Sequence, residues 1–236
     1  MINRATLTLA ILLMFIAVGL MACEDLKEEI NENTKQTQNF AFELTDGWVP
    51  LMSVEAADVV VNTVCGFDPV SINTIISATD YADMWEDVKG HIDEVKIKQL
   101  GYRLSENTAT EAGAVKLYVI SGEKPAAKAV PQEVIEELLD DPQLLYIADQ
   151  NDLNESDLIA SIPINPGQDI DDWTDVDWAT GGESSLEEML IDFEQEFTFC
   201  LMMDSTPVQV GSISDLNPTV YMKLQSDVDI VFVPLD

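Results

Sequence analysis

Histidine is nearly absent from this chain, which contains a single one, His91, among 236 residues. Nucleophilic catalysis needs a base beside the nucleophile, and histidine is the side chain that most often supplies it. The sequence also lacks a Gly-x-Ser-x-Gly elbow, a phosphate-binding glycine-rich loop and a His-Glu-x-x-His motif. Paired carboxylates can hydrolyse glycosides, but among 44 acidic residues some pair will lie at any chosen spacing. We therefore predict that the protein is not an enzyme.

Basic residues are scarce as well, with 11 Lys and Arg against 44 Asp and Glu and a formal net charge of −33. From residue 129 to the end there are 25 acids and one base, Lys223. Such a surface repels nucleic acid phosphates and anionic lipid headgroups, so we predict no nucleic acid partner. Two interpretations stay open: a solvated acidic coat, including one adapted to high ionic strength, and a surface that binds cations or basic partners.

The sequence has no apolar run long enough to cross a membrane comfortably. Its longest, from Leu9 to Ala22, has 14 residues, whereas a hydrocarbon core of about 30 Å needs ~20. One basic residue, Arg4, precedes this run, and the charged stretch Glu24 to Glu29 follows it. This order of basic, apolar and small residues is typical of a secretory signal.

The four residues that close the run, Leu20-Met21-Ala22-Cys23, resemble a bacterial lipobox. The resemblance implies that residues 1–22 are removed and that Cys23 becomes the lipidated first residue. Removal would take away Arg4 and no acid, so the net charge would change from −33 to −34. Met21 stands where lipoboxes more often carry a small residue. An ordinary signal peptide cleaved after Ala22 and an uncleaved membrane anchor are the alternatives.

Cysteine is scarce, and with Cys23 assigned to the lipid only Cys65 and Cys200 remain. An exported protein meets an oxidising compartment, so a disulfide between these two is one hypothesis. The alternative is two separate buried thiols that act as small hydrophobic residues. Because there is no Cys-x-x-Cys and only one histidine, a zinc site is poorly supported.

Residues 23–37 are charged and polar and predict a flexible tether, whereas residues 38–236 predict a single domain. Alternation of apolar and polar residues begins at Phe40 and marks a strand with one buried face. Further strands are predicted at 59–64, 92–104, 114–120, 144–148, 158–164, 197–203, 208–210, 220–224 and 228–233. In the second of these the phase slips near Gln99, as a β-bulge would require.

Three short helices interrupt these strands. One is predicted after a cap at Thr79-Asp80, one from Pro131 to Leu139, and one over residues 185–193 with Ser184 and Glu187 as a capping box. Since the helices do not alternate regularly with strands, we predict a mainly β protein. Its expected fold is an antiparallel β-sandwich, Ig-like or jelly-roll-like, with helices inserted in the connections. Residues 92–120 are predicted to form a hairpin.

Two groups of residues are candidate binding sites. Calcium prefers carboxylate oxygens, and five aspartates fall within nine residues: Asp169, Asp171, Asp172, Asp175 and Asp177. A second acidic cluster covers residues 149–157. Neither matches an EF-hand, and a solvated acidic loop is the alternative for both. Trp173 and Trp178 are candidates for stacking on sugar rings, the alternative being that they plug one end of the sandwich.

The whole layout of lipobox, tether and strand-rich domain is similar to that of uncharacterised bacterial envelope lipoproteins. The resemblance implies a protein of the bacterial cell envelope, held by its lipid at the outer membrane or cell surface and facing an oxidising compartment. We expect a binding or structural role without catalysis, with a protein or glycan partner left open. A carbohydrate- or calcium-binding module of a cell-surface system is the alternative, and a hydrolase that uses carboxylates comes third.

Overall fold

The structure is a computed structural model that describes residues 35–45, 47–56, 59–66, 70–77, 82–128, 130, 136, 145–212 and 215–233. The signal sequence, Cys23 and most of the predicted tether therefore lie outside the described residues. So does the predicted helix from 131 to 139, except for Glu136, which is helical. None of the described helices is both long and apolar enough to cross a bilayer.

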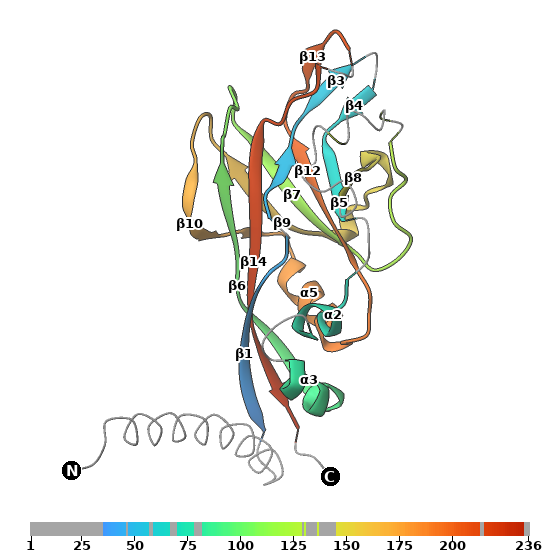
Figure 1. The fold of residues 1–236 in the computed structure, drawn as a ribbon, viewed down its shortest axis with the longest axis vertical. Helices are drawn as coiled ribbons and strands as arrows, with labels where there is room; N and C mark the ends of the chain where they lie inside the picture. Colours follow the sequence, from blue (N-terminus) through green and yellow to red (C-terminus); the bar gives the residue numbers. More distant parts are fainter. Residues whose placement is uncertain are drawn as a thin grey trace, which may run out of the picture.

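Two antiparallel sheets form the body of the molecule, as Figure 1 shows. The first sheet has the order β1 (Gln36–Glu43), β14 (Val220–Phe232), β6 (Ile92–Ser105) and β10 (Ile170–Asp175), and β2 (Val49–Leu51) also pairs with β14. The second sheet has the order β11 (Asp177–Trp178), β9 (Leu158–Ile164), β7 (Gly113–Ile120), β12 (Thr198–Asp204), β5 (Thr63–Gly66) and β8 (Leu145–Ile147). The predicted antiparallel β-sandwich is confirmed.

A small third sheet lies at one end of the sandwich (Figure 1). It consists of β13 (Val208–Val210), β3 (Val54–Ala56) and β4 (Val59–Val61), and β13 runs parallel to β3. The single strand predicted over 59–64 is therefore wrong. Asn62 separates β4 from β5, and its carbonyl accepts a hydrogen bond from the Met203 amide. The chain thus leaves the third sheet and enters the second within one residue.

The strand β14 is longer than predicted. Its 13 residues alternate without interruption between buried and partly exposed positions. Two strands, at 220–224 and 228–233, are predicted from the sequence, with Ser226 between them at what proves to be an inward position. Ser226 is nevertheless buried, and its hydroxyl has no hydrogen-bond partner. The apolar residues on either side therefore keep the strand continuous, although burying the Ser226 hydroxyl without a hydrogen bond costs free energy.

The predicted bulge in β6 is confirmed. Along the β14–β6 pair, Asp227 lies opposite Gln99, but the next residue, Val228, lies opposite Ile97. One extra residue, Lys98, is thus accommodated in β6. The slip restores an apolar inward face on both sides of the bulge, with Val95 and Ile97 before it and Leu100 after it.

The predicted hairpin over 92–120 is wrong. β6 pairs with β14 and β10 in the first sheet, whereas β7 pairs with β12 and β9 in the second. Residues 106–112 therefore carry the chain across the sandwich. Seven residues exceed the two to five of ordinary hairpin loops, and an alternating pattern identifies a buried face without identifying the neighbouring strand.

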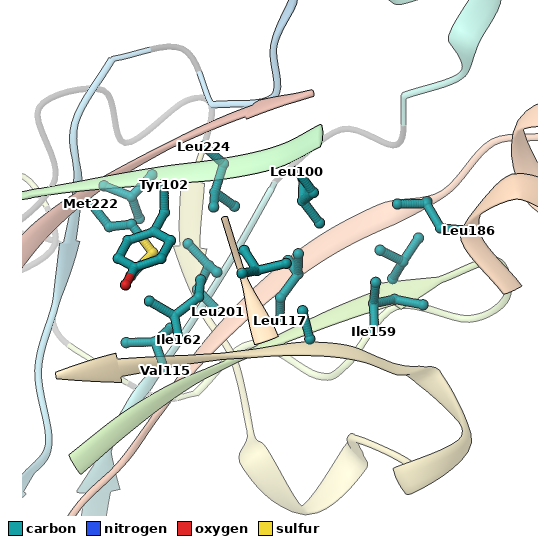
Figure 2. Packing of buried hydrophobic residues seen from close by; sticks show 14 of the residues in the cluster. Leu100, Tyr102, Val115, Leu117, Ile159, Ile162, Leu186, Leu201, Met222 and Leu224 are labelled. Carbon is teal, nitrogen blue, oxygen red and sulfur yellow. The ribbon is translucent and has the colours of Figure 1, made fainter. Parts of the chain in front are cut away.

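The main core lies between the two sheets. Figure 2 shows inward side chains of the first sheet facing those of the second: Leu100, Tyr102, Met222 and Leu224 on one side, and Val115, Leu117, Ile162 and Leu201 on the other. At the other end of β1, β6 and β14 the helices α2 (Ile72–Ser77), α3 (Ala82–Val88) and α5 (Gly182–Ile191) lie beside the strands (Figure 1). We call these two parts the sandwich half and the helix-covered half.

Trp85 of α3 is the centre of the helix-covered half. Its side chain is fully buried, and its ring meets Phe40 of β1 and Phe193 edge-on, with centroids 6.0 and 6.3 Å away. Its indole nitrogen donates a hydrogen bond to the Asn73 side chain at 2.8 Å. Val88 is also buried, in agreement with the predicted helix face, while Tyr81 and the cap at Thr79-Asp80 lie outside the described residues. The helix α2 was not predicted.

The helix α5 begins earlier than predicted, and the capping box is wrong. Gly181, in the left-handed conformation with φ of 80°, is the N-cap and contributes no side-chain hydrogen bond. A Cβ on Gly182 would lie 2.0 Å from the Ile159 carbonyl oxygen, so the helix can start against β9 only with glycine there. Glu187 instead accepts a hydrogen bond from the Ile97 amide at 2.9 Å, where the edge of β6 lacks a strand partner beyond β10.

Both ends of the described chain meet at the helix-covered end of the molecule. Gln36, the first residue of β1, lies opposite Phe232, the last residue of β14. The ordered strand therefore begins two residues inside the predicted tether of 23–37. The third sheet lies at the opposite end (Figure 1).

Candidate functional site

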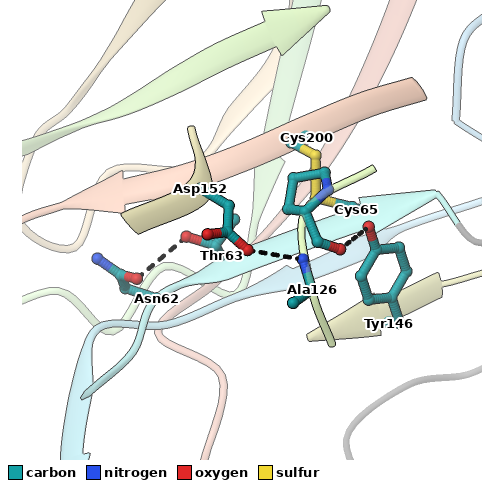
Figure 3. The surroundings of a disulfide bond; sticks show 8 residues. Asn62, Thr63, Cys65, Ala126, Tyr146, Asp152 and Cys200 are labelled. Carbon is teal, nitrogen blue, oxygen red and sulfur yellow. Dashed lines mark hydrogen bonds between the residues drawn. A yellow bond between two sulfur atoms is a disulfide. The ribbon is translucent and has the colours of Figure 1, made fainter. Parts of the chain in front are cut away.

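The two remaining cysteines are joined in the structure. Cys65 of β5 and Cys200 of β12 lie directly opposite each other in the second sheet and form a disulfide (Figure 3). The bond connects neighbouring strands of one sheet and does not bridge the two sheets. Both residues are buried in a second, smaller apolar cluster with Tyr118, Ile120 and Tyr146, on the face of the second sheet that points away from the main core.

The second acidic cluster, residues 149–157, helps to cover this disulfide. Asp152 accepts a hydrogen bond from the Ala126 amide at 2.9 Å, and Tyr146 donates one to the Pro125 carbonyl at 3.0 Å (Figure 3). Asp149 accepts from the Asn151 amide and from Lys128, and these bonds lower the pKa of its carboxyl group. The hydrogen bonds of Asp149 and Asp152 thus stabilise this loop, and a calcium ion is not needed to explain these two acids.

The five aspartates of the predicted calcium site do not lie in one loop: Asp169 precedes β10, three belong to β10 in the first sheet, and Asp177 belongs to β11 in the second. Asp169 accepts a hydrogen bond from the Asn107 amide at 2.9 Å, and Asp175 accepts one from Gln99 at 2.6 Å. Burial, and to a smaller extent the charge of Asp177, raises the pKa of Tyr102. Across the described part of the chain, no three His, Cys, Asp or Glu side chains gather where they could hold a metal ion.

The two predicted stacking tryptophans are also separated. Trp173 belongs to β10 in the first sheet, and Trp178 belongs to β11 in the second, where it packs partly buried against the main core. The chain crosses between the sheets at Val176, whose amide donates to the Leu100 carbonyl at 3.0 Å. The packing of Trp178 against the core thus agrees with the alternative interpretation, in which a tryptophan plugs one end of the sandwich. Trp173 lies in the other sheet and has different neighbours.

The outer face of the first sheet carries an unexpected pair of cations. Lys223 of β14 and Arg103 of β6 lie directly opposite each other. Both are at outward positions, since the residues on either side, Met222 and Leu224, Tyr102 and Leu104, are buried. Like charges directly opposite on adjacent strands destabilise a sheet.

A tryptophan lies beside each of these cations. The guanidinium carbon of Arg103 lies 4.4 Å from the centroid of the Trp173 ring, and the ammonium of Lys223 lies 5.5 Å from that of Trp48. Trp48 precedes β2, on the far side of β14 from β6. The four residues therefore form a row across the sheet in the order Trp48, Lys223, Arg103 and Trp173, which we call the cation–aromatic row. At about 4.8 Å per strand the row spans roughly 14 Å.

Arg103 has no anionic partner within the described residues. The salt bridges there are all made by lysines, and the buried Nε of Arg103 has no hydrogen-bond partner. An unsatisfied buried donor costs about 1–3 kcal/mol. Lys223 has one carboxylate nearby, Glu43, at 3.7 Å. The cation–aromatic row therefore combines two poorly neutralised cations with two aromatic rings.

Sequence reasoning missed this site because its residues are far apart in the chain. The scarcity of basic residues in the sequence could nevertheless have indicated the two cations. Lys223 is the one base after residue 128, and Arg103 and Arg4 are the two arginines of the chain. Nothing near Trp48 in the sequence indicates its pairing with Trp173, because the sheet alone brings them onto one face.

The pockets of the described structure do not include the cation–aromatic row. An apolar pocket of about 210 Å³ opens where β2, β5, β8 and β12 meet, and its lining contains no charged side chain. Two shallower hollows of about 180 and 230 Å³ adjoin each other beside β13 and share Ala109, Thr110, Val208 and Thr219. His91 lies at the opposite end, after α3, where its carbonyl accepts from the Val233 amide.

Comparison with known proteins identifies no family. The chain matches no protein-family model, and no curated protein is significantly similar to it in sequence. Among solved structures it is similar to tobacco necrosis virus, with a TM-score of 0.30 and 9% identity over 86% of this chain and 98% of that one. For a nodavirus VLP from the giant freshwater prawn Macrobrachium rosenbergii the TM-score is 0.32, with 12% identity over 86% of each chain. Likeness at this level indicates no function.

Proposed function

We propose that the protein is a lipid-anchored component of the bacterial cell envelope that acts by binding and not by catalysis. The observation that carries the proposal is Cys23 at the end of its apolar run, in the lipobox-like sequence Leu20 to Cys23. The disulfide between Cys65 and Cys200 supports an oxidising compartment, since such bonds are rare in the cytosol. The single histidine and the missing catalytic motifs support the absence of catalysis.

The position of the ordered strands fits an N-terminal anchor. β1 begins at Gln36 beside the end of β14, so the first and last strands of the described chain end together at the helix-covered end. Residues 24–35, extended at about 3.5 Å each, reach roughly 40 Å. With a lipid on Cys23, this segment would hold the helix-covered end toward the membrane and leave the third sheet and the outer face of the first sheet accessible to other molecules.

Metabolic labelling with a fatty acid tests the anchor. We expect the wild-type protein to incorporate label and to fractionate with membranes, and Cys23→Ser to lose both properties, because the thioether link needs that sulfur. The double variant Cys65→Ala/Cys200→Ala is the matched control: it removes two cysteines and should stay labelled. Labelling of Cys23→Ser at the wild-type level would rule out the lipoprotein function.

A further inference from the structure

We propose that the cation–aromatic row on the outer face of the first sheet binds an acidic saccharide. A sugar carboxylate would lie between the guanidinium of Arg103 and the ammonium of Lys223, and sugar rings would stack on Trp173 and Trp48. The inference extends the proposed function, since it names the class of ligand for a protein that acts by binding.

The first argument is electrostatic. Arg103 and Lys223 are cross-strand neighbours whose charges repel, and among the described residues their one ion pair is that of Lys223 with Glu43 at 3.7 Å. An anion placed between the two cations would turn this repulsion into attraction on both sides. Arginine is suited to a carboxylate because its planar fork donates two parallel hydrogen bonds. Contact with Trp173 holds that fork in place before the ligand arrives, which lowers the entropy cost of binding.

The second argument is the shape of the site. The row crosses a sheet face over about 14 Å, with a flat aromatic ring at each end. A small inorganic anion would be poorly enclosed there, because sites for small molecules are concave. An extended chain of sugar rings can instead span the row and pack on the parts of the two half-buried indoles that Arg103 and Lys223 leave uncovered.

The third argument is the size of the charge. Only two cations are available, and the chain as a whole carries −33. A nucleic acid continues its charge, one per residue, far beyond the two cations, where the surrounding acids would repel it. A saccharide with a few carboxylates has enough charge to use the pair and enough uncharged surface to use the rings. The site therefore favours an acidic saccharide over a nucleic acid.

Titration calorimetry of the full-length protein in detergent tests the proposal. The probes are trigalacturonic acid and its methyl ester, which has the same rings without the charge. We expect the acid to bind and the ester to bind about 10- to 100-fold more weakly, the range for losing a charge-assisted hydrogen bond. Equal binding of acid and ester, or binding of neither, would overturn the proposal.

Four variants locate the binding. Arg103→Gln should weaken binding of trigalacturonic acid about 10- to 100-fold, and Trp48→Ala should weaken it up to about tenfold. Glu43→Gln should strengthen binding a few-fold, because it removes the carboxylate that competes for Lys223. The matched control is Lys116→Gln, which removes a cation from the second sheet, where Lys116 pairs with Asp204. Each variant is compared only if its melting temperature shows that it is folded.

Three results would contradict the assignment of the site. A loss of affinity in Lys116→Gln as large as in Arg103→Gln would mean that binding follows total charge. Unchanged affinity in both Arg103→Gln and Glu43→Gln would place the ligand elsewhere. Tight binding of a Glu-rich peptide with no binding of the sugar would assign the row to an acidic peptide. None of these results bears on fatty-acid labelling, so the lipoprotein proposal and the saccharide proposal fail separately.

Discussion

The two halves of β14 each bury an apolar face, but the elements that cover this face differ: strands in one half and helices in the other. In the sandwich half, Val220, Met222 and Leu224 face the strands of the second sheet (Figure 2). In the helix-covered half, inward residues of the same strand lie opposite β1, whose Phe40 packs on Trp85 of α3. An alternating pattern therefore indicates that one face of a strand is buried. Which element covers that face is decided by parts of the chain that are far away in sequence.

The halves also differ in what holds the cover in place. In the second sheet the disulfide between Cys65 and Cys200 joins two neighbouring strands, and the two cysteines are separated by 135 residues in the sequence. The helices depend on packing around one fully buried tryptophan. Since β6 and β14 run through both halves, we expect the described domain to unfold as one cooperative unit, with each half open to separate disruption.

The largest expected effect is on the sandwich half, through the disulfide. Cys65→Ala/Cys200→Ala should lower the free energy of unfolding by about 4–5 kcal/mol in the chain-entropy model, because the bond closes a long loop. Urea denaturation followed by far-UV circular dichroism measures this loss. If mass spectrometry after alkylation without reductant finds both thiols modified in the exported wild-type protein, the bond does not form and this comparison of the halves is wrong.

Truncation of Trp85 is the corresponding test of the helix-covered half. Trp85→Ala should lower the free energy of unfolding by about 3–5 kcal/mol, since it leaves a large cavity and removes the hydrogen bond from the indole to the Asn73 side chain. Leu117→Ala, at a fully buried position of the sandwich half, is the matched variant, with an expected loss of about 2–5 kcal/mol. Both variants should retain a single unfolding transition. Two transitions in Trp85→Ala would show that the halves are independent.

Ser226 lies where β14 passes from one cover to the other, and its replacement should stabilise the protein. Its buried hydroxyl lacks a partner, so Ser226→Ala removes a desolvation penalty, and we expect a gain of about 1 kcal/mol in the free energy of unfolding. Ser53→Ala is the control, because the hydroxyl of Ser53 is equally buried but donates to the Ser205 carbonyl at 3.0 Å. That variant should lose about 1 kcal/mol. Equal changes in both variants would contradict the argument.

The smallest effect concerns salt, which acts on both halves through the surface. A rise from ~0.1 M to ~1 M sodium chloride shortens the Debye length from about 10 Å to about 3 Å, so the melting temperature should rise as repulsion between carboxylates is screened. Calcium and magnesium at equal ionic strength should have equal effects unless an oxygen-ligand site exists. Much stronger stabilisation by calcium would direct mutagenesis to Asp169–Asp177. A melting temperature that falls with salt would contradict the repulsion argument.

Local features of the fold could be predicted because local residues determine them. Alternation marked β1 from Phe40, strand-like apolar segments marked β9 and β12, and the phase slip near Gln99 marked the bulge in β6. Pairing could not be predicted in the same way. β6 and β7 have equally good inward faces, and whether two such strands lie side by side or face to face depends on β14 and β12, which follow some 80 residues or more later in the chain.

The candidate site was harder to predict than the fold. Trp173 was recognised as an aromatic ring suited to stacking, but it was grouped with Trp178, its neighbour in sequence. The crossing at Val176 separates the two, and the sheet instead brings Trp48 onto the same row. The aspartates around Trp173 were prominent because they are close in sequence, yet the distinctive charges of this face are the two rare cations, Arg103 and Lys223.

The antiparallel pairing of β1 with the end of β14 also determines how the molecule would bear a mechanical load. A pull on Gln36 along the strand axis, against a ligand held higher on the first sheet, is directed along β1 and across its hydrogen bonds to β14. All of the bonds in that pair, from Gln36 to Glu43, would then resist together, and none would be opened one at a time from the end. A tether that leaves the domain at this point thus pulls the strand pair in shear, the direction in which a sheet resists most.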